Sequence, residues 1–159
     1  MATNTVRIRG GGLALDTFGR SIGILARRLN VFLNHELVGC GISARELMYL
    51  GALLECDGMT QDQLAGEFCI DKAAVARALQ AMEEKGLVLR IEDSEDRRAK
   101  RVLATQKARD LRPFIEGVQR RWRTLCNPGC ADRELAQLER ALAAMAERVK
   151  QAADDCDGT

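Results

Sequence analysis

The sequence is poor in the residues on which many enzymes rely. Of its 159 residues, one is histidine, two are proline and 4% are aromatic. A single histidine offers little for acid–base chemistry, and the chain has no nucleophile elbow and no glycine-rich phosphate loop. No apolar run approaches the roughly 20 residues that cross a bilayer, and the first residues lack the hydrophobic region of a signal peptide. We therefore expect a cytoplasmic protein that is not an enzyme and spans no membrane.

An excess of charge of one sign is also missing. The chain has 24 Lys and Arg against 23 Asp and Glu, a formal net charge of +1. Total charge therefore does not indicate a nucleic-acid partner, and any such partner must be inferred from where the charges lie.

Cysteine is present six times but never as a C-x-x-C pair. With one histidine in the chain, this spacing predicts no metal site, and we expect no cofactor. In the cytoplasm the thiols are expected to be reduced and inert. A redox-sensing regulator stays open as an alternative, with candidate thiols at Cys40, Cys69, Cys126, Cys130 and Cys156.

The most informative stretch begins with two short helices. Thr60 and Gln63 have the three-residue spacing of a capping box, which predicts a helix start. Asp71 is the expected cap of a second helix, whose apolar seam recurs every three or four residues. This helix is expected to end before Gly86, because glycine readily takes the left-handed conformation that follows a helix. The pattern predicts a helix-turn-helix whose recognition helix covers 71–85.

A hairpin is expected after the second helix. The runs 87–91 and 101–105 are rich in branched residues and predict two paired strands. Between them lies the charged segment 92–100, which predicts a tip that projects into solvent. A helix-turn-helix followed by a hairpin is a winged helix-turn-helix, whose second helix enters a DNA major groove. The expected fold is mainly α with a small β-hairpin wing.

The same stretch resembles the MarR-type bacterial transcription regulators. The family pattern is carried by TQDQLA at 60–65, by IDKAAVARALQAMEEKGLVLR at 70–90 and by DSEDRRAKRVLAT at 93–105. The resemblance extends more loosely over most of the chain from about residue 13. It implies a sequence-specific transcription regulator, a repressor, that binds double-stranded DNA with the recognition helix in the major groove and the wing, over 92–101, at the minor groove.

The residues of the recognition helix expected at the DNA are Lys72, Ala73, Ala74, Ala76, Arg77 and Gln80. Arg77 is the expected base contact, because a guanidinium can donate two hydrogen bonds to guanine. Contact with phosphate alone, or pairing with a nearby acid, is the alternative. Family members usually carry serine or threonine where this chain has the three alanines. Sequence specificity is therefore expected to rest more on thymine methyl groups and on DNA shape.

The hairpin tip holds a local cluster of positive charge. Asp96 with Arg97 or Arg98 matches the wing signature of the family, and Lys100 lies beside them. The resemblance implies that one arginine enters the minor groove while the aspartate orients it, since a narrow groove attracts cations. A merely solvated loop would have the same composition and stays the alternative.

Three further helices bear more apolar surface than a winged domain covers. They are expected over 13–38, 106–125 and 132–153, the second of them kinked or delayed by Pro113. An apolar face without a partner in its own chain predicts a second chain. We expect a twofold homodimer, which sets two recognition helices about 34 Å apart for a palindromic operator. A monomeric bundle is the alternative.

The expected organisation has three parts: a flexible N-terminal arm over 1–12, a helical dimerisation region made of 13–42 and 106–159, and a winged helix-turn-helix DNA-binding domain over 43–105. The alternative for the arm is a contact with DNA or with a partner chain. Ser43 and Glu46 have the spacing of a second capping box, which starts a helix over 44–56.

In the family, an effector often binds between the dimerisation helices and the winged domain. The resemblance implies a small aromatic or phenolic molecule that releases the protein from DNA. The candidate residues at this junction are Phe32, His35, Arg45 and Tyr49. The simpler interpretation of His35 is an ordinary surface or core residue, and that of Tyr49 is a core residue with a satisfied hydroxyl.

One other class of function stays open. The near-neutral charge and the alanine-rich recognition helix are compatible with a winged protein-interaction module that binds no specific DNA. Salt-dependent DNA binding distinguishes the two classes.

Overall fold

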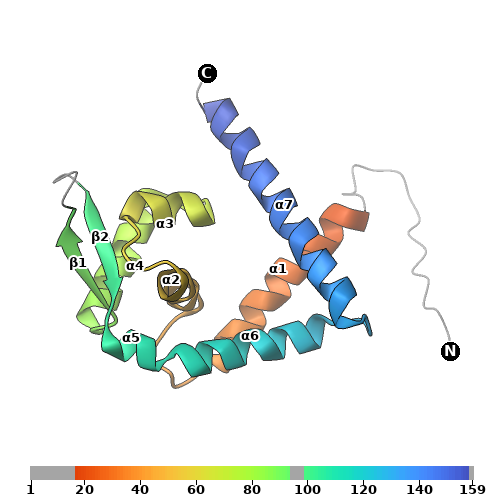
Figure 1. Ribbon diagram of the computed structural model, residues 1–159, viewed down its shortest axis with the longest axis horizontal. Helices are drawn as coiled ribbons and strands as arrows, with labels where there is room; N and C mark the ends of the chain where they lie inside the picture. The colour runs from red at the N-terminus through yellow and green to blue at the C-terminus, as the bar shows by residue number, and fades with distance from the viewer. Residues whose placement is uncertain (1–16, 94–98, 158–159) are drawn as a thin grey trace.

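The computed structural model describes residues 17–93 and 99–157, and the side chains among these as far as residue 152. The predicted arm over 1–12 lies outside the described residues. The elements, in chain order, are α1 (Thr17–Glu36), α2 (Ala44–Glu55), α3 (Gln61–Phe68), α4 (Lys72–Glu84), β1 (Val88–Glu92), β2 (Lys100–Ala104), α5 (Gln106–Asp110), α6 (Arg112–Cys126) and α7 (Asp132–Asp157). The predicted fold class, mainly helical with a two-stranded antiparallel wing, is confirmed. Figure 1 shows α3, α4 and the hairpin grouped around α2, with α1, α6 and α7 on the other side.

Local caps set the helix starts that the sequence predicted. At α3, the Gln63 amide donates to the Thr60 hydroxyl over 3.1 Å and the Thr60 amide donates to the Gln63 side chain over 2.7 Å, which completes the capping box. At α4, the Asp71 carboxylate accepts from the Ala74 amide over 3.0 Å. These bonds satisfy amides that have no partner within the helix, so each helix begins where its cap stands.

The core is centred on α2. Tyr49, Leu50 and Leu53 of this helix have no exposed surface. Leu64 of α3, fully buried residues of α4 and both strands, and parts of α5 and α6 pack in the same cluster: Val75, Leu79, Met82, Val88, Val102, Ala108 and Val118. Because the cluster reaches α5 and α6, the winged unit and the helix that follows it share one core.

The wing is a short antiparallel ladder. Val88 pairs with Ala104, Arg90 with Val102, and the strands end at the Glu92–Lys100 pair. The ladder covers 88–92 and 100–104, one residue away from the predicted runs 87–91 and 101–105.

The helix predicted over 106–125 is divided in two. The α5 and α6 helices meet at Leu111, and Pro113 lies in the first turn of α6, where its missing N–H leaves no helical bond unmade. The proline thus begins a new helix, where the sequence predicted either a kink or a delayed regular start. The last helix is longer than predicted and continues to Asp157.

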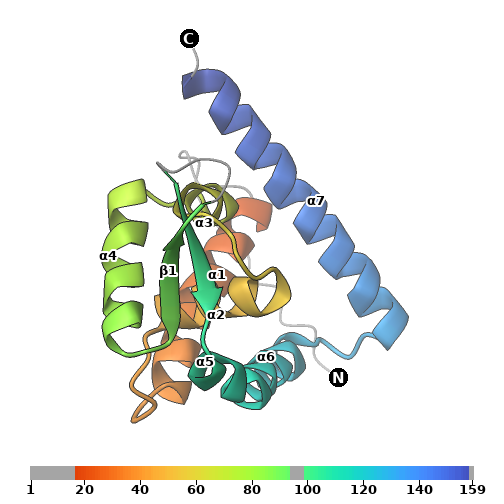
Figure 2. The ribbon, with the colours of Figure 1, turned by 60° about the vertical axis from the view of Figure 1, so that its left-hand side comes forward.

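The long α7 helix lies along one side of the molecule (Figure 2), and none of its described side chains is buried. Its apolar seam is open to solvent, with Leu138, Leu142, Met145 and Val149 between 42% and 70% exposed. An ion pair of 3.2 Å joins Lys150 of α7 to Glu67 of α3. Among the described residues, no helix is both long enough and apolar enough to cross a membrane.

Candidate nucleic-acid interface and the adjoining hollow

Helix α4, the predicted recognition helix, is fixed to the core by one face. Val75, Leu79 and Met82 are fully buried, which determines that the opposite face points outward. Of the six predicted contact positions, four are exposed and two are half-buried, the latter being Ala74 and Ala76. The outward face therefore carries the residues that the sequence predicts to contact DNA.

The polar residues on this face differ in whether they already have a partner. The Lys72 ammonium lies 2.8 Å from the Asp62 carboxylate of α3, and Gln80 donates to Glu84 over 3.2 Å. Arg77 makes no hydrogen bond or ion pair with another residue in the part of the chain that the structure describes. Arg77 thus offers a free guanidinium, whereas the charge of Lys72 is partly offset by an acid that the sequence reading missed.

The tip of the wing, with Asp96, Arg97 and Arg98, lies outside the described residues. Lys100 is exposed at the start of β2.

The base of the wing is anchored by an aspartate that the sequence analysis did not single out. Asp93 is 5% exposed, and its carboxylate lies 2.7 Å from the Arg101 guanidinium, which also donates to the Gly58 carbonyl over 3.2 Å. These contacts tie the hairpin to the turn between α2 and α3. The position of Asp93, an acid directly after a predicted strand and beside a charged loop, was the signal in the sequence that could have predicted this anchor.

A second carboxylate fixes the wing to α5. Asp57 accepts from the Ala104 amide over 2.8 Å and from Arg109 over 2.6 Å. Partial burial would raise the pKa of Asp57, but these hydrogen bonds and the charge of Arg109 outweigh it and hold the pKa below its ordinary value. The carboxylate is therefore ionised at neutral pH and holds the strand end in place.

An open hollow of about 670 Å³ lies between α1, the start of α2 and the recognition helix. Arg45 and Arg77 both line it, and neither is bonded to another described residue. Its remaining walls are largely small or apolar, with Met48, Ile70 and the α4 alanines among them. Glu46 also lines the hollow, but its carboxylate is bonded to Lys85, so the two unpaired cations and the apolar surface still suit an organic anion.

The four residues predicted to bind an effector are not gathered at this hollow. Arg45 lines it, whereas His35 is exposed near the end of α1. The ring of Phe32 packs on Trp122, with centroids 5.3 Å apart. Tyr49 is fully buried against Phe68, with ring centroids 5.5 Å apart. Tyr49 and Phe32 therefore contribute to packing, and Arg45 is the predicted residue placed to meet a ligand there.

The Tyr49 hydroxyl differs from its expected state. It is buried and has no hydrogen-bond partner among the described residues, so the prediction of a satisfied hydroxyl is wrong. Burial raises the pKa of Tyr49, although the positive charge of Arg45 acts in the opposite direction.

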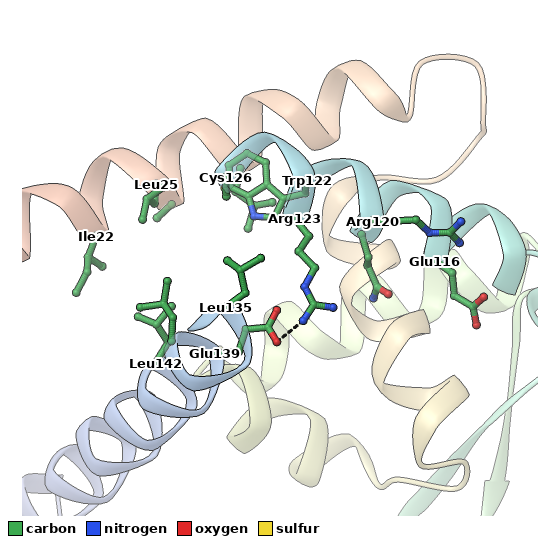
Figure 3. A pocket seen from close by; sticks show the side chains of 14 residues that line it. Ile22, Leu25, Glu116, Arg120, Trp122, Arg123, Cys126, Leu135, Glu139 and Leu142 are labelled. Carbon is green, nitrogen blue, oxygen red and sulfur yellow. Dashed lines mark hydrogen bonds and ion pairs between the residues drawn. The ribbon is translucent and has the colours of Figure 1, made fainter. Parts of the chain in front are cut away.

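A second and more apolar cleft, of about 750 Å³, separates α1, α6 and α7. Figure 3 shows Ile22 and Leu25 of α1, Trp122 of α6 and Leu142 of α7 facing it, with the Arg123–Glu139 ion pair at its edge. Its walls belong to the three helices that the sequence assigned to dimerisation.

The cysteines with described side chains form no disulfide. Cys40, Cys69 and Cys126 are exposed and Cys130 is half-buried, all as free thiols. Although Cys126 is exposed, neighbouring protein atoms shield its thiol in part from water. This partial burial raises the pKa of the thiol and so disfavours the reactive thiolate. Cys156 lies in the last turns of α7, beyond the described side chains. Among the described residues, no group of three or more His, Cys, Asp or Glu side chains is placed to hold a metal ion.

Known proteins match this arrangement in both sequence and structure. The model of the MarR family matches residues 42–100. YybA, a helix-turn-helix-type transcriptional regulator of Bacillus subtilis, is 27% identical over 96 residues, which are 60% of this chain and 64% of YybA. The chain thus matches somewhat less than two thirds of the length of that relative.

Two solved structures extend the likeness over most of the chain. A MarR transcriptional regulator from Methanosarcina mazei Go1 is 28% identical, with a TM-score of 0.79 over 87% of this chain and 99% of that one. CouR from Rhodococcus jostii RHA1, bound to p-coumaroyl-CoA, is 26% identical, with a TM-score of 0.73 over 85% and 96% of the two chains. The matched region contains the capped α3, the recognition helix and the base of the wing. Residues 42–100 therefore match the MarR family in sequence, and most of the chain is similar in structure to solved transcriptional regulators of that family.

Proposed function

We propose that the protein is a transcription regulator, a repressor, that binds a palindromic double-stranded operator as a homodimer. The observation that carries the proposal is the outward face of α4, where Arg77 has no partner among the described residues while the opposite face is fixed in the core. A rigid helix with a free guanidinium suits base recognition in a major groove. The relatives named as transcriptional regulators support the same function.

The homodimer is supported by the cleft between α1, α6 and α7. Its apolar walls, together with the open seam of α7, form an apolar surface of the kind that monomeric proteins rarely leave uncovered. A second copy of the chain would cover it and set the two recognition helices on the same side of a duplex.

Release by a small organic anion is supported by the hollow beside α4. Because Arg77 belongs both to the hollow and to the DNA-facing surface, a ligand held there competes for the same guanidinium. CouR, which binds p-coumaroyl-CoA, shows an aromatic ligand in a protein of this fold. We assign Arg45 as the second anchor for a carboxylate, with the apolar wall for an aromatic ring.

The DNA-binding part is tested by selecting duplexes from a random library and titrating the protein, by fluorescence anisotropy, against the selected duplex and a scrambled one. We expect selective binding whose affinity falls steeply with salt. Equal and weak binding to both duplexes would favour the protein-interaction module instead.

The effector part is tested on the same complex with p-coumarate and its thioester with coenzyme A. We expect at least one of them to release the DNA, and we expect the Arg45→Ala variant to need more ligand than the wild type. The matched control is His35→Ala, which changes an exposed residue near the end of α1 that does not line the hollow. A response that Arg45→Ala leaves unchanged would remove the hollow from the proposal.

A further inference from the structure

We infer that the buried Glu46 carboxylate and the exposed Lys85 form a link through which the first turn of α2 positions the recognition helix for DNA. Glu46 lies at the start of α2 and Lys85 caps the C-terminal end of α4. The link is a positioning device that rests on the proposed DNA binding, and neither residue is assigned a contact with DNA.

The geometry of the pair is closely defined. The Lys85 ammonium donates to both carboxylate oxygens of Glu46, over 2.9 and 2.8 Å. One of these oxygens also accepts from the Ser43 amide over 2.7 Å, which closes the capping box of α2. Glu46 is 4% exposed, whereas the Lys85 side chain is 40% exposed, so the carboxylate is shielded from water and the ammonium is in part solvated. A buried acid held on both oxygens allows little movement between the two helix ends.

Two opposing effects act on the pKa of the Glu46 carboxyl. Burial by itself would raise the pKa of Glu46, but the hydrogen bonds from Lys85 and Ser43, with the charge of Lys85, together lower it. The carboxylate is therefore ionised at neutral pH and accepts from Lys85 as an anion.

Lys85 is also held from the other side of α4. Its carbonyl accepts from the Lys107 ammonium of α5 over 2.7 Å, and the next carbonyl, that of Gly86, accepts from the Thr105 hydroxyl over 2.8 Å. The C-terminal end of the recognition helix is thus clamped between α2 and α5. Since α5 leads directly into α6, the clamp connects the recognition helix to the helical region.

Glu46 also lines the hollow beside α4. A ligand in the hollow would meet the side chain that holds the far end of the recognition helix. The link therefore offers a route by which occupation of the hollow reaches the orientation of α4, in addition to the direct competition for Arg77.

The decisive variant is Glu46→Gln. A glutamine at this position keeps the capping box, since its amide oxygen accepts from the Ser43 amide as the carboxylate does, but it removes the charge that Lys85 binds. Lys85→Met removes the other partner and keeps the apolar stem. Glu83→Gln is the matched control, because it breaks an ion pair with Arg90 at the same end of α4 without touching α2.

The experiment measures the affinity of each variant for the selected duplex at several salt concentrations, together with hydrogen exchange of the amides at 79–85. We expect Glu46→Gln and Lys85→Met each to weaken binding about tenfold with an unchanged salt slope, and the double variant to lose no more than either single one. We expect exchange at 79–85 to be faster in these three variants, and Glu83→Gln to stay within about threefold of the wild type in both measurements.

Three results would overturn the link. A lower salt slope in Lys85→Met with unchanged binding by Glu46→Gln would make Lys85 a phosphate contact. If the loss of affinity in the double variant equalled the product of the two single losses, the two residues would act independently. A lowered melting temperature with unchanged exchange at 79–85 and unchanged affinity would leave the pair a role in stability only.

The exchange measurement also separates this inference from the proposed function. If the wild type selects no duplex, the proposed function fails, whereas faster exchange at 79–85 in Glu46→Gln but not in Glu83→Gln still supports the link. If the wild type binds selectively but Glu46→Gln leaves exchange at 79–85 unchanged, the link is removed and the proposed function stands.

Discussion

The winged half of the chain, α2 to β2, and the helical half, α1 with α6 and α7, differ in how far they cover their own apolar surface. Around α2, residues such as Leu50 and Leu53 are fully buried and the wing is tied down through Asp57 and Asp93. Along α7, by contrast, no described side chain is buried, and Leu142 faces a cleft. One half is therefore complete within a single chain, and the other has a surface that suits a further partner.

The largest expected effect on stability lies in the completed half. Leu53→Ala removes a fully buried side chain and should lower the free energy of unfolding by about 2–5 kcal/mol. Leu125→Ala is the control, since that side chain is 67% exposed, and it should change the free energy by no more than about 0.5 kcal/mol in the monomer. Urea titration measures both. Equal losses would mean that the core does not lie where the buried residues indicate.

Changing the cleft should alter assembly and leave the fold intact. Leu142→Glu puts a charge into the apolar cleft, so we expect the dimer to dissociate at concentrations where the wild type stays associated, with helix content unchanged. Ala144→Glu adds the same charge to the same helix outside the residues that line the cleft. Sedimentation velocity distinguishes the two variants, and a wild type that sediments as a monomer would contradict the second-chain account.

Acid should affect the winged half first. The pKa values of Glu46 and Asp57 are lowered in the folded protein, so each contributes stability above its unfolded pKa, about 4.3 for Glu and 3.9 for Asp. This contribution is lost as the pH falls through the lower folded values. We expect the urea concentration at the unfolding midpoint to decrease as the pH is lowered below about 4. In Asp57→Asn we expect this decrease to be less steep. An identical pH profile in that variant would exclude Asp57 as a source of the acid sensitivity.

The smallest expected effect concerns the partly neutralised lysine. Asp62→Asn removes the acid that pairs with Lys72, so DNA affinity should rise by about twofold to threefold at low salt. Lys72→Met should abolish this gain in the double variant. An unchanged affinity in Asp62→Asn would show that Lys72 does not reach the DNA.

The features that the sequence predicted correctly depend on contacts between residues that are close together along the chain. The caps at Thr60 and Asp71, the end of α4 before Gly86 and the delayed start at Pro113 depend on neighbours within a few residues, and all are found where they were expected. These features are local consequences of hydrogen-bonding capacity and backbone geometry.

The site was less predictable because its contacts join distant parts of the chain. Asp62 meets Lys72 and Asp93 meets Arg101 only once the helices and strands are packed. The same packing turns Tyr49 into the core. Helical spacing showed which face each residue is on, but not which element lies opposite it.

The most direct test of the account compares wild type with Arg77→Ala in an anisotropy titration against the selected and the scrambled duplex. We predict that the wild type prefers the selected duplex and that Arg77→Ala loses about tenfold or more of that preference. Arg133→Ala, which removes an exposed cation from α7, should keep it. Full retention of the preference by Arg77→Ala, or no preference in the wild type, would contradict the assignment of α4 as the helix that reads DNA.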